Sequence, residues 1–372
     1  MRRRARAVLV AILVLAMMVV ASTGCGSSSA GSGGGAGSGA SSGSTTGGGS
    51  SSGSGSGGGA GSGASSGSGD DLGTSEIPGD AGQADTSIGG DGGAIKTGDG
   101  GTSAPSIICP ATALQPGDTT ASVQVGGVMR SYILHVPTGY TGKTAVPLVL
   151  DFHPILADDT YERNNSGYAT LADQEGFVVA FPNGIDNAWN IGPCCTQSRT
   201  VDDLGFAKTL VTTLEGQACV DAKRVYAVGY SMGGGMSHYL ACNAADVFAS
   251  VAPAAFDLLE DSEEPCHPSR PITEISFRGT ADPIVPYGGG ASNPPNGLNV
   301  TIHFLGAVGT FQKWAQLDGC TGSPSAADSH GCSTYSQCQV GVEVTLCTTQ
   351  GGGHVTGDPQ IGWAMLKAHP MP

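Results

Sequence analysis

Short apolar runs alternate with stretches of helical periodicity from about residue 119 onward. Apolar and polar positions alternate over 121–125 and 129–136, on either side of Gly126-Gly127, which predicts a β-hairpin. Later runs are continuously apolar, which is typical of strands buried on both faces. They predict strands at 147–152, 177–181, 224–228, 248–253, 272–277 and 342–347, with helices at 165–176, 201–216, 231–242, 307–317 and 359–368. Strands that alternate with helices predict an α/β fold: a mainly parallel sheet covered by helices on both faces.

The first hundred residues lack this periodicity. Residues 1–25 join an arginine-rich start to an apolar run that is short for a membrane span, which is typical of an export signal. This segment ends in Ser-Thr-Gly-Cys, which resembles the lipobox of bacterial lipoproteins and predicts lipidation of Cys25; plain secretion with cleavage nearby is the alternative. Residues 26–104 are rich in Gly and Ser with little to bury, which predicts a disordered linker. We expect one folded domain over 105–372.

Charge and cysteine content narrow the class of protein. A net charge of −15 argues against nucleic acid and against an anionic membrane surface as partners. Of the 11 cysteines, all but Cys25 lie in the predicted domain, and with an export signal they predict disulfides. We expect Cys242 to pair with Cys266, since a helix end and the loop beyond the next strand can meet. No spacing fits C-x-x-C or a zinc pattern, so we predict no metal site.

The most informative stretch is a predicted strand at 224–228 that runs through Gly229-Tyr230-Ser231-Met232-Gly233 into a predicted helix. In this G-x-S-x-G context a sharp strand-to-helix turn exposes the serine hydroxyl at the strand's carboxyl end. The helix start behind it points N–H groups toward an oxyanion. The same letters surround Ser41 and Ser65 in the linker, where no strand or helix is expected. An ordinary strand-to-helix turn remains the alternative for Ser231.

A serine nucleophile needs a base and a group that orients the base. Asp282 follows the strand at 272–277, and His354 follows the strand at 342–347 within a glycine run. The chain order Ser231, Asp282, His354 is that of an α/β-hydrolase triad, with each residue in a loop after a strand. Asp257, after the strand at 248–253, is the alternative acid. The other histidines lie in less suitable places, such as the hairpin, a helix interior or the end of the chain.

The same reasoning predicts an oxyanion hole and a pocket. Met232, directly after the nucleophile, is expected to supply one N–H donor. The loop after the strand at 147–152 reads His153-Pro154-Ile155, and because proline has no N–H, Ile155 must supply the other. Loss of one such donor costs about 3 kcal/mol of transition-state stabilisation. Candidate aromatic residues for a substrate pocket are Trp189, Tyr230 and Tyr287.

The chain resembles the secreted esterase family that groups polyhydroxybutyrate depolymerases with feruloyl and acetyl xylan esterases, within the α/β-hydrolase fold. Matching stretches span most of residues 122–372, in the family's order. They are Trp189-Asn190 with Cys194-Cys195, Val201 to Phe206, Cys219-Val220-Asp221, Arg224-Val225-Tyr226, Gly229 to Gly234, Leu240-Ala241-Cys242, Val251-Ala252-Pro253, Gly279 to Tyr287 and Gly351 to His354. Two positions depart from the pattern: Pro154 replaces the glycine of a His-Gly loop, and Val355-Thr356-Gly357 stands where Trp-Pro-Gly usually follows the catalytic histidine.

The resemblance implies an exported serine carboxylic ester hydrolase that needs no cofactor and uses Ser231, Asp282 and His354 as its triad. We expect a feruloyl or acetyl xylan esterase that acts on small or polymer-linked esters of plant cell-wall polysaccharide. Hydroxyalkanoate esters, as for polyhydroxybutyrate depolymerases, are the alternative substrates. Another hydrolase of this fold and a catalytically inactive binding protein also stay open, the latter because of Pro154. Membrane attachment is expected only through a lipid on Cys25.

Overall fold

The computed structural model describes residues 107–192, 194–196, 198–260, 266–293 and 300–372. The predicted export signal, the site at Cys25 and the whole predicted linker lie outside these residues. Within them, no helix is long and apolar enough to cross a membrane.

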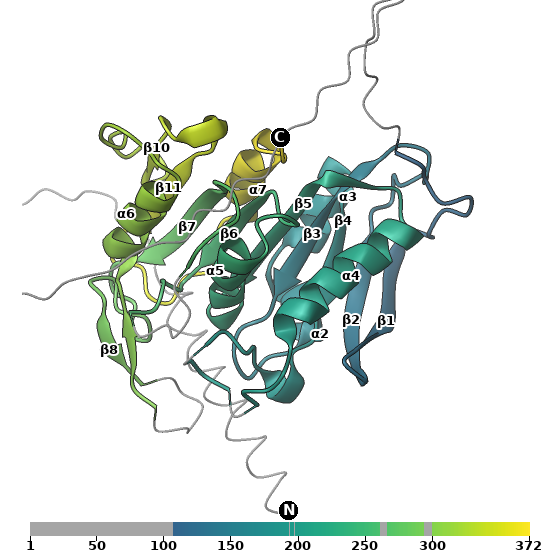
Figure 1. Ribbon diagram of the computed structural model, residues 1–372, viewed down its shortest axis with the longest axis horizontal. Helices are drawn as coiled ribbons and strands as arrows, with labels where there is room; N and C mark the ends of the chain where they lie inside the picture. Colours follow the sequence, from purple (N-terminus) through teal and green to yellow (C-terminus); the bar gives the residue numbers. More distant parts are fainter. Residues whose placement is uncertain (1–106, 193, 197, 261–265, 294–299) are drawn as a thin grey trace, which may run out of the picture. The chain divides into compact units, whose positions relative to one another are not determined.

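Nine strands of the described residues form one sheet, in the order β1-β2-β4-β3-β5-β6-β7-β11-β10 (Figure 1). Neighbours from β4 to β11 are parallel, while β1, β2 and β10 add antiparallel edges. The mainly parallel sheet is therefore confirmed. Its strands are β1 (Gly117–Val125), β2 (Val128–Val136), β3 (Val146–Phe152), β4 (Val178–Pro182), β5 (Val220–Tyr230), β6 (Ser250–Ala254), β7 (Thr273–Gly279), β10 (Cys332–Tyr335) and β11 (Val344–Thr349). β8 (Gly290–Ser292) and β9 (Ile302–Phe304) pair separately.

Helices cover both faces of the large sheet, as predicted. Apolar side chains of α4, α5 and α6 form the core on one face, and those of α3 and α7 form the core on the other. The helices are α2 (Asp159–Asn165), α3 (Tyr168–Glu175), α4 (Asp203–Gln217), α5 (Met232–Asn243), α6 (Ala307–Leu317) and α7 (Pro359–Ala368), with 3-10 turns η1 (Ile185–Asn187) and η2 (Gln339–Gly341). The central strands have continuous buried runs because both of their faces are covered.

Two local predictions need correction. The helix predicted at 165–176 begins only at Tyr168, because Gly167 adopts a left-handed φ of 84° and separates α3 from the unpredicted α2. Asp202 and Asp203 lie at the start of the predicted helix at 201–216, where aspartates are expected to cap free N–H groups. Asp202 does so, since its carboxylate accepts from the Gly205 N–H at 2.7 Å. Asp203 is not a cap: it is buried and bonds to Arg130 at 2.6 Å.

All ten cysteines of the described residues are paired in disulfides. The expected Cys242–Cys266 disulfide is confirmed. The other pairs are Cys109–Cys219, Cys194–Cys195, Cys320–Cys338 and Cys332–Cys347. The Cys194–Cys195 bridge joins neighbouring residues in the chain, so it stabilises a local loop conformation rather than a contact between distant segments.

The strand order changes direction between β3 and β5. The chain leaves β3 toward β4 on one side, and it leaves β5 toward β6 on the other side. At such a switch point the two loops diverge and leave a crevice at the carboxyl ends of the strands, where open α/β sheets place their ligands. Ile155 lies in the loop after β3 and Ser231 directly after β5, so both belong to this crevice.

Candidate active site

Ser231 occupies a strained turn between β5 and α5, with φ 55° and ψ −121°. Such a conformation costs on the order of 1–3 kcal/mol and persists only where the surroundings impose it. The Ser231 N–H donates to the Ala254 carbonyl at 2.9 Å, which holds the turn against β6. A Cβ at Gly229 or Gly233 would overlap backbone atoms, at Gly233 the carbonyl oxygen of Phe152. The two glycines of the motif are therefore required by close packing.

Asp282 and His354 lie in loops that follow the neighbouring parallel strands β7 and β11. The Ala281 N–H donates to the Gly352 carbonyl at 2.8 Å, which joins the two loops next to both side chains. Gly279 has no room for a Cβ because the Gly352 carbonyl lies against it. The two loops therefore pack as one unit, and the separation of the acid and the imidazole is set by backbone contacts.

Both oxygens of the Asp282 carboxylate accept hydrogen bonds. Its Oδ2 lies 2.8 Å from His354 Nδ1, and its Oδ1 accepts from the N–H groups of Ile284 and Val285 at 2.8 and 3.0 Å. Burial by itself would raise the pKa of Asp282, but the hydrogen bond and charge of His354 and the two amides outweigh it, so the pKa is lowered. Asp282 is therefore ionised at neutral pH and able to balance a charged imidazole.

His354 packs beside the end of β5, the strand that precedes Ser231. The Tyr230 hydroxyl donates to the His354 carbonyl at 2.8 Å, and the two rings lie 5.1 Å apart between centroids. Tyr230 directly precedes Ser231, so the imidazole is held next to the serine turn. Among the described residues the Ser231 hydroxyl has no hydrogen-bond partner. Hydrogen bonds between a nucleophile and its base are often long before substrate binds.

The alternative acid and a competing histidine have other partners. Asp257 is buried and forms an ion pair with Arg278. His238 is also buried, and its Nδ1 accepts from Trp314 Nε1 at 3.1 Å. Burial lowers the pKa of His238 to about 3, so this imidazole is too weak a base to accept a proton near neutral pH. Neither residue forms a nucleophile–base–acid arrangement.

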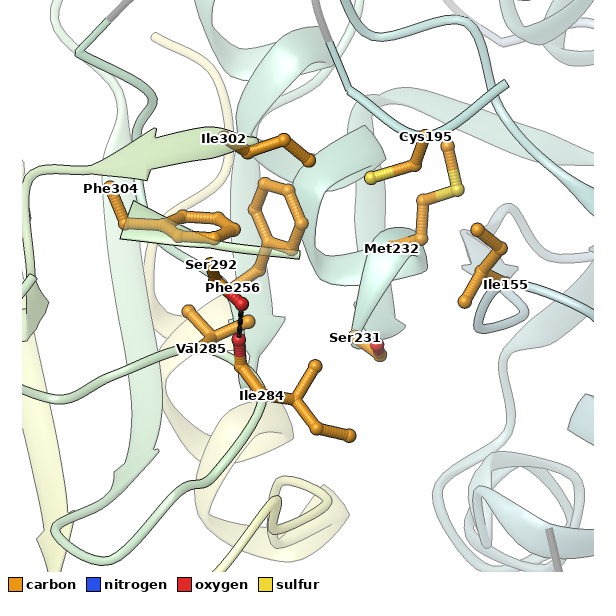
Figure 2. A pocket seen from close by; sticks show the side chains of 10 residues that line it. All are labelled: Ile155, Cys195, Ser231, Met232, Phe256, Ile284, Val285, Ser292, Ile302 and Phe304. Carbon is orange, nitrogen blue, oxygen red and sulfur yellow. Dashed lines mark hydrogen bonds between the residues drawn. The ribbon is translucent and has the colours of Figure 1, made fainter. Parts of the chain in front are cut away.

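An apolar pocket opens beside Ser231 (Figure 2). Its walls are mostly aliphatic and aromatic, with Ser292 as the polar exception besides Ser231. The lining residues are Ile155, Cys195, Ser231, Met232, Phe256, Ile284, Val285, Ser292, Ile302 and Phe304. Both predicted oxyanion residues, Met232 and Ile155, therefore border the same space as the serine. Met232 begins α5, where the first N–H groups lack partners within the helix.

None of the three predicted aromatic residues lines this pocket. Trp189 is fully buried, and its indole N–H donates to the His153 carbonyl at 2.9 Å. Tyr230 bonds to the loop of His354, and the Tyr287 hydroxyl lies 2.8 Å from Thr348 Oγ1. The aromatic wall consists instead of Phe256 and Phe304, whose rings meet edge to face with centroids 5.2 Å apart. Phe256 lies three residues after the predicted strand at 248–253, and this position beyond a strand end is the sequence signal that could have identified it.

The strand order, the strained serine between β5 and α5, and the joined loops of Asp282 and His354 are those of an α/β-hydrolase. No family model matches the chain. The chain is 42% identical to feruloyl esterase B from Piromyces equi over 250 residues, which are 65% of this chain and 46% of that protein. It is 31% identical to the putative esterase NocK from Nocardia uniformis subsp. tsuyamanensis over 252 residues, 63% of this chain and 73% of that protein.

More distant matches carry related names. The bifunctional acetylxylan esterase/xylanase XynS20E from Neocallimastix patriciarum is 26% identical over 242 residues, 58% of this chain and 35% of that protein. Among solved structures, an acetyl xylan esterase from Aspergillus awamori matches with a TM-score of 0.49 and 15% identity, over 67% of this chain and 99% of that one. The chain spans less than half of feruloyl esterase B. It belongs to the esterase family of α/β-hydrolase fold that these relatives represent.

Proposed function

We propose that the protein is a serine esterase that releases hydroxycinnamoyl or acetyl groups from plant cell-wall polysaccharide esters. Ser231 is the nucleophile, His354 the base and Asp282 the acid. The observation that carries the proposal is the 2.8 Å contact between His354 Nδ1 and the buried Asp282 carboxylate, at the sheet edge where the strained Ser231 turn also lies. Feruloyl esterase B and the acetylxylan esterase XynS20E, among the relatives, support this substrate class.

The roles follow from the hydrogen bonds. Asp282 accepts a hydrogen bond from Nδ1–H of His354, which leaves Nε2 with a lone pair that can take the Ser231 proton. Ser231 then attacks the ester carbonyl, and the oxyanion binds to the N–H groups of Met232 and Ile155. His354 returns the proton to the leaving alcohol, and a water molecule hydrolyses the acyl-enzyme by the same route.

The pocket supports an apolar acyl group. Phe256 and Phe304 offer ring faces and edges to a planar hydroxycinnamoyl group, and aromatic contacts of this kind add about 0.5–1.5 kcal/mol each beyond area burial. The five disulfides of the described residues support export, because disulfides persist in oxidising compartments.

The test uses the full chain, a fluorophosphonate probe with peptide mapping, and three substrates: methyl ferulate, acetylated xylan and a hydroxybutyrate oligomer. We expect labelling at Ser231 and turnover of ferulate or xylan acetate. Ser231→Ala should abolish both while thermal unfolding stays nearly unchanged. Ser250→Ala is the matched control, since Ser250 is buried on β6 and bonds to His369 away from the site. Absence of labelling would favour an inactive binding protein, and turnover of only the hydroxybutyrate oligomer would overturn the substrate class.

A further inference from the structure

His153 is a buried histidine beside the site with no role in the proposed triad. It lies directly after β3, and its side chain is inaccessible to solvent. Nε2 accepts from the Gly184 N–H at 2.9 Å, and Nδ1 lies 2.8 Å from the Pro154 carbonyl oxygen. The indole of Trp189 packs on the ring at 4.7 Å between centroids and donates to the His153 carbonyl. Every polar atom of the imidazole is therefore occupied.

These partners define the tautomer of His153. A backbone N–H can only donate, so Nε2 carries a lone pair toward Gly184. A carbonyl can only accept, so Nδ1 carries the proton toward Pro154. Burial lowers the pKa of His153 to about 4, and the ring therefore keeps this neutral form near neutral pH. His153 is thus a fixed donor to the Pro154 carbonyl.

That hydrogen bond orients the next peptide group. The carbonyl of Pro154 and the N–H of Ile155 belong to one planar trans peptide, in which they point in opposite directions. The Pro154 oxygen is held by His153 Nδ1 and also by the Ala157 N–H at 3.2 Å. The Ile155 N–H must then point away from the His153 ring. Among the described residues it has no hydrogen-bond partner, and Ile155 lines the pocket beside Ser231 (Figure 2).

We propose that His153 is a positioning residue that aims the Ile155 N–H at the oxyanion through the Pro154 carbonyl. The inference rests on the proposed function, since it needs an oxyanion at Ser231. It also accounts for Pro154: the donor required at this loop belongs to the following residue, and the fixed φ of proline restricts the loop without removing that donor.

The test compares three substitutions at this position by steady-state kinetics with methyl ferulate. His153→Asn places an amide N–H near the position of Nδ1 and keeps the donor to Pro154, but loses the acceptor for Gly184. His153→Gln reaches the Gly184 N–H but lacks the donor to Pro154, and His153→Leu lacks both. We expect the Gln and Leu variants to lose about 10²-fold in kcat with little change in KM, as when an oxyanion donor is removed. The Asn variant should recover most of kcat.

Stability separates this role from a purely structural one. Each variant loses at least one buried hydrogen bond, so all three should unfold at lower temperature, whereas only two should lose kcat. Equal kcat losses in the Asn and Gln variants, or losses that follow Tm, would overturn the inference. If the variants do not fold, an α-hydroxy acid at position 155 replaces only the Ile155 N–H by oxygen. The same 10²-fold loss is then expected, and an unchanged kcat would overturn the inference.

The wild-type protein separates failure of this inference from failure of the proposed function. Fluorophosphonate labelling at Ser231 and ester turnover establish the function independently of His153. Labelled, active wild-type protein together with unaffected Gln and Leu variants would overturn the positioning role alone. Wild-type protein with neither labelling nor turnover would overturn both.

Discussion

Asp282→Asn tests the acid of the proposed triad with almost no change in side-chain size. Oδ1 of Asp282 accepts from two backbone N–H groups, those of Ile284 and Val285. An amide nitrogen in that position would face two donors, so the asparagine must keep its oxygen there. Its N–H2 group is then forced to face Nδ1 of His354, where the carboxylate oxygen lies at 2.8 Å.

The forced orientation changes the tautomer of the base. Opposite an N–H2 donor, Nδ1 of His354 must present a lone pair, so the ring proton moves to Nε2. An Nε2–H group cannot accept the Ser231 proton, and general-base catalysis is lost. We expect kcat to fall by about 10⁴, which corresponds to about 5.5 kcal/mol.

Stability should change far less than activity. The lowered pKa of Asp282 means that its carboxylate contributes stability above the unfolded pKa and loses it as the pH falls through the folded value. The substitution should therefore lower Tm slightly at pH 7 and not at all in strong acid. The assays are kcat with methyl ferulate and ¹⁵N shifts of His354, which report the tautomer directly.

Asp257→Asn is the matched control for Asp282→Asn. It also neutralises a buried carboxylate, but one paired with Arg278 rather than with an imidazole. It should lower Tm by leaving the buried Arg278 without its ion-pair partner, and keep kcat within about tenfold. The reasoning fails if Asp282→Asn retains more than about a tenth of kcat, or if its His354 keeps the proton on Nδ1.

Further substitutions test the close packing at the serine turn and the titration of a buried carboxyl group on β7. Gly233→Ala would push a Cβ into the Phe152 carbonyl oxygen, so the serine turn must shift. We expect a loss of folding stability above about 3 kcal/mol and no fluorophosphonate labelling. The control is Gly216→Ala, in open space on α4, which should stabilise the fold by about 0.5–1 kcal/mol. Burial raises the pKa of Glu274 to about 8. Folding stability that is present below pH 4.5 is therefore lost as the pH rises toward 8, by up to about 1.4 kcal/mol per pH unit. Glu274→Gln should flatten this pH dependence of thermal unfolding, and an unchanged slope would contradict the assignment.

The parts of the fold that follow from local sequence were predictable. The bounds of α7 match the prediction because Pro359 occupies its first turn and Asp358 caps it. Buried strands such as β3 were recognisable because both faces are apolar. By contrast, β8 and β9 have only three residues each, too few for a periodic signal. The break at Gly167 was missed because only Asn165 and Ser166 of the predicted helix precede it, too few residues for a periodic signal.

The candidate site shows the same division. Chain order and loop position predict Ser231, Asp282 and His354 as the triad, since parallel strands deliver their following loops to one edge; the structure brings Asp282 and His354 into contact there. The pocket was not predictable, because its walls come from segments whose meeting depends on tertiary packing. Trp189 illustrates the reason: in a loop rich in small residues it looks accessible, yet in the fold it packs against His153 and is buried.

Under the proposed function, the β8–β9 pair contributes to substrate recognition and lies apart from the residues proposed for the chemistry. Ser292, Ile302 and Phe304 reach the pocket from these two strands, which do not belong to the large sheet. The proposed nucleophile, base and acid all follow strands of that sheet. Substitution within β8 and β9 can therefore alter which acyl group is accepted while the sheet keeps the reacting groups in register. For directed evolution, and for natural divergence within the family, β8 and β9 are therefore segments in which acyl preference can change without a substitution in the proposed triad.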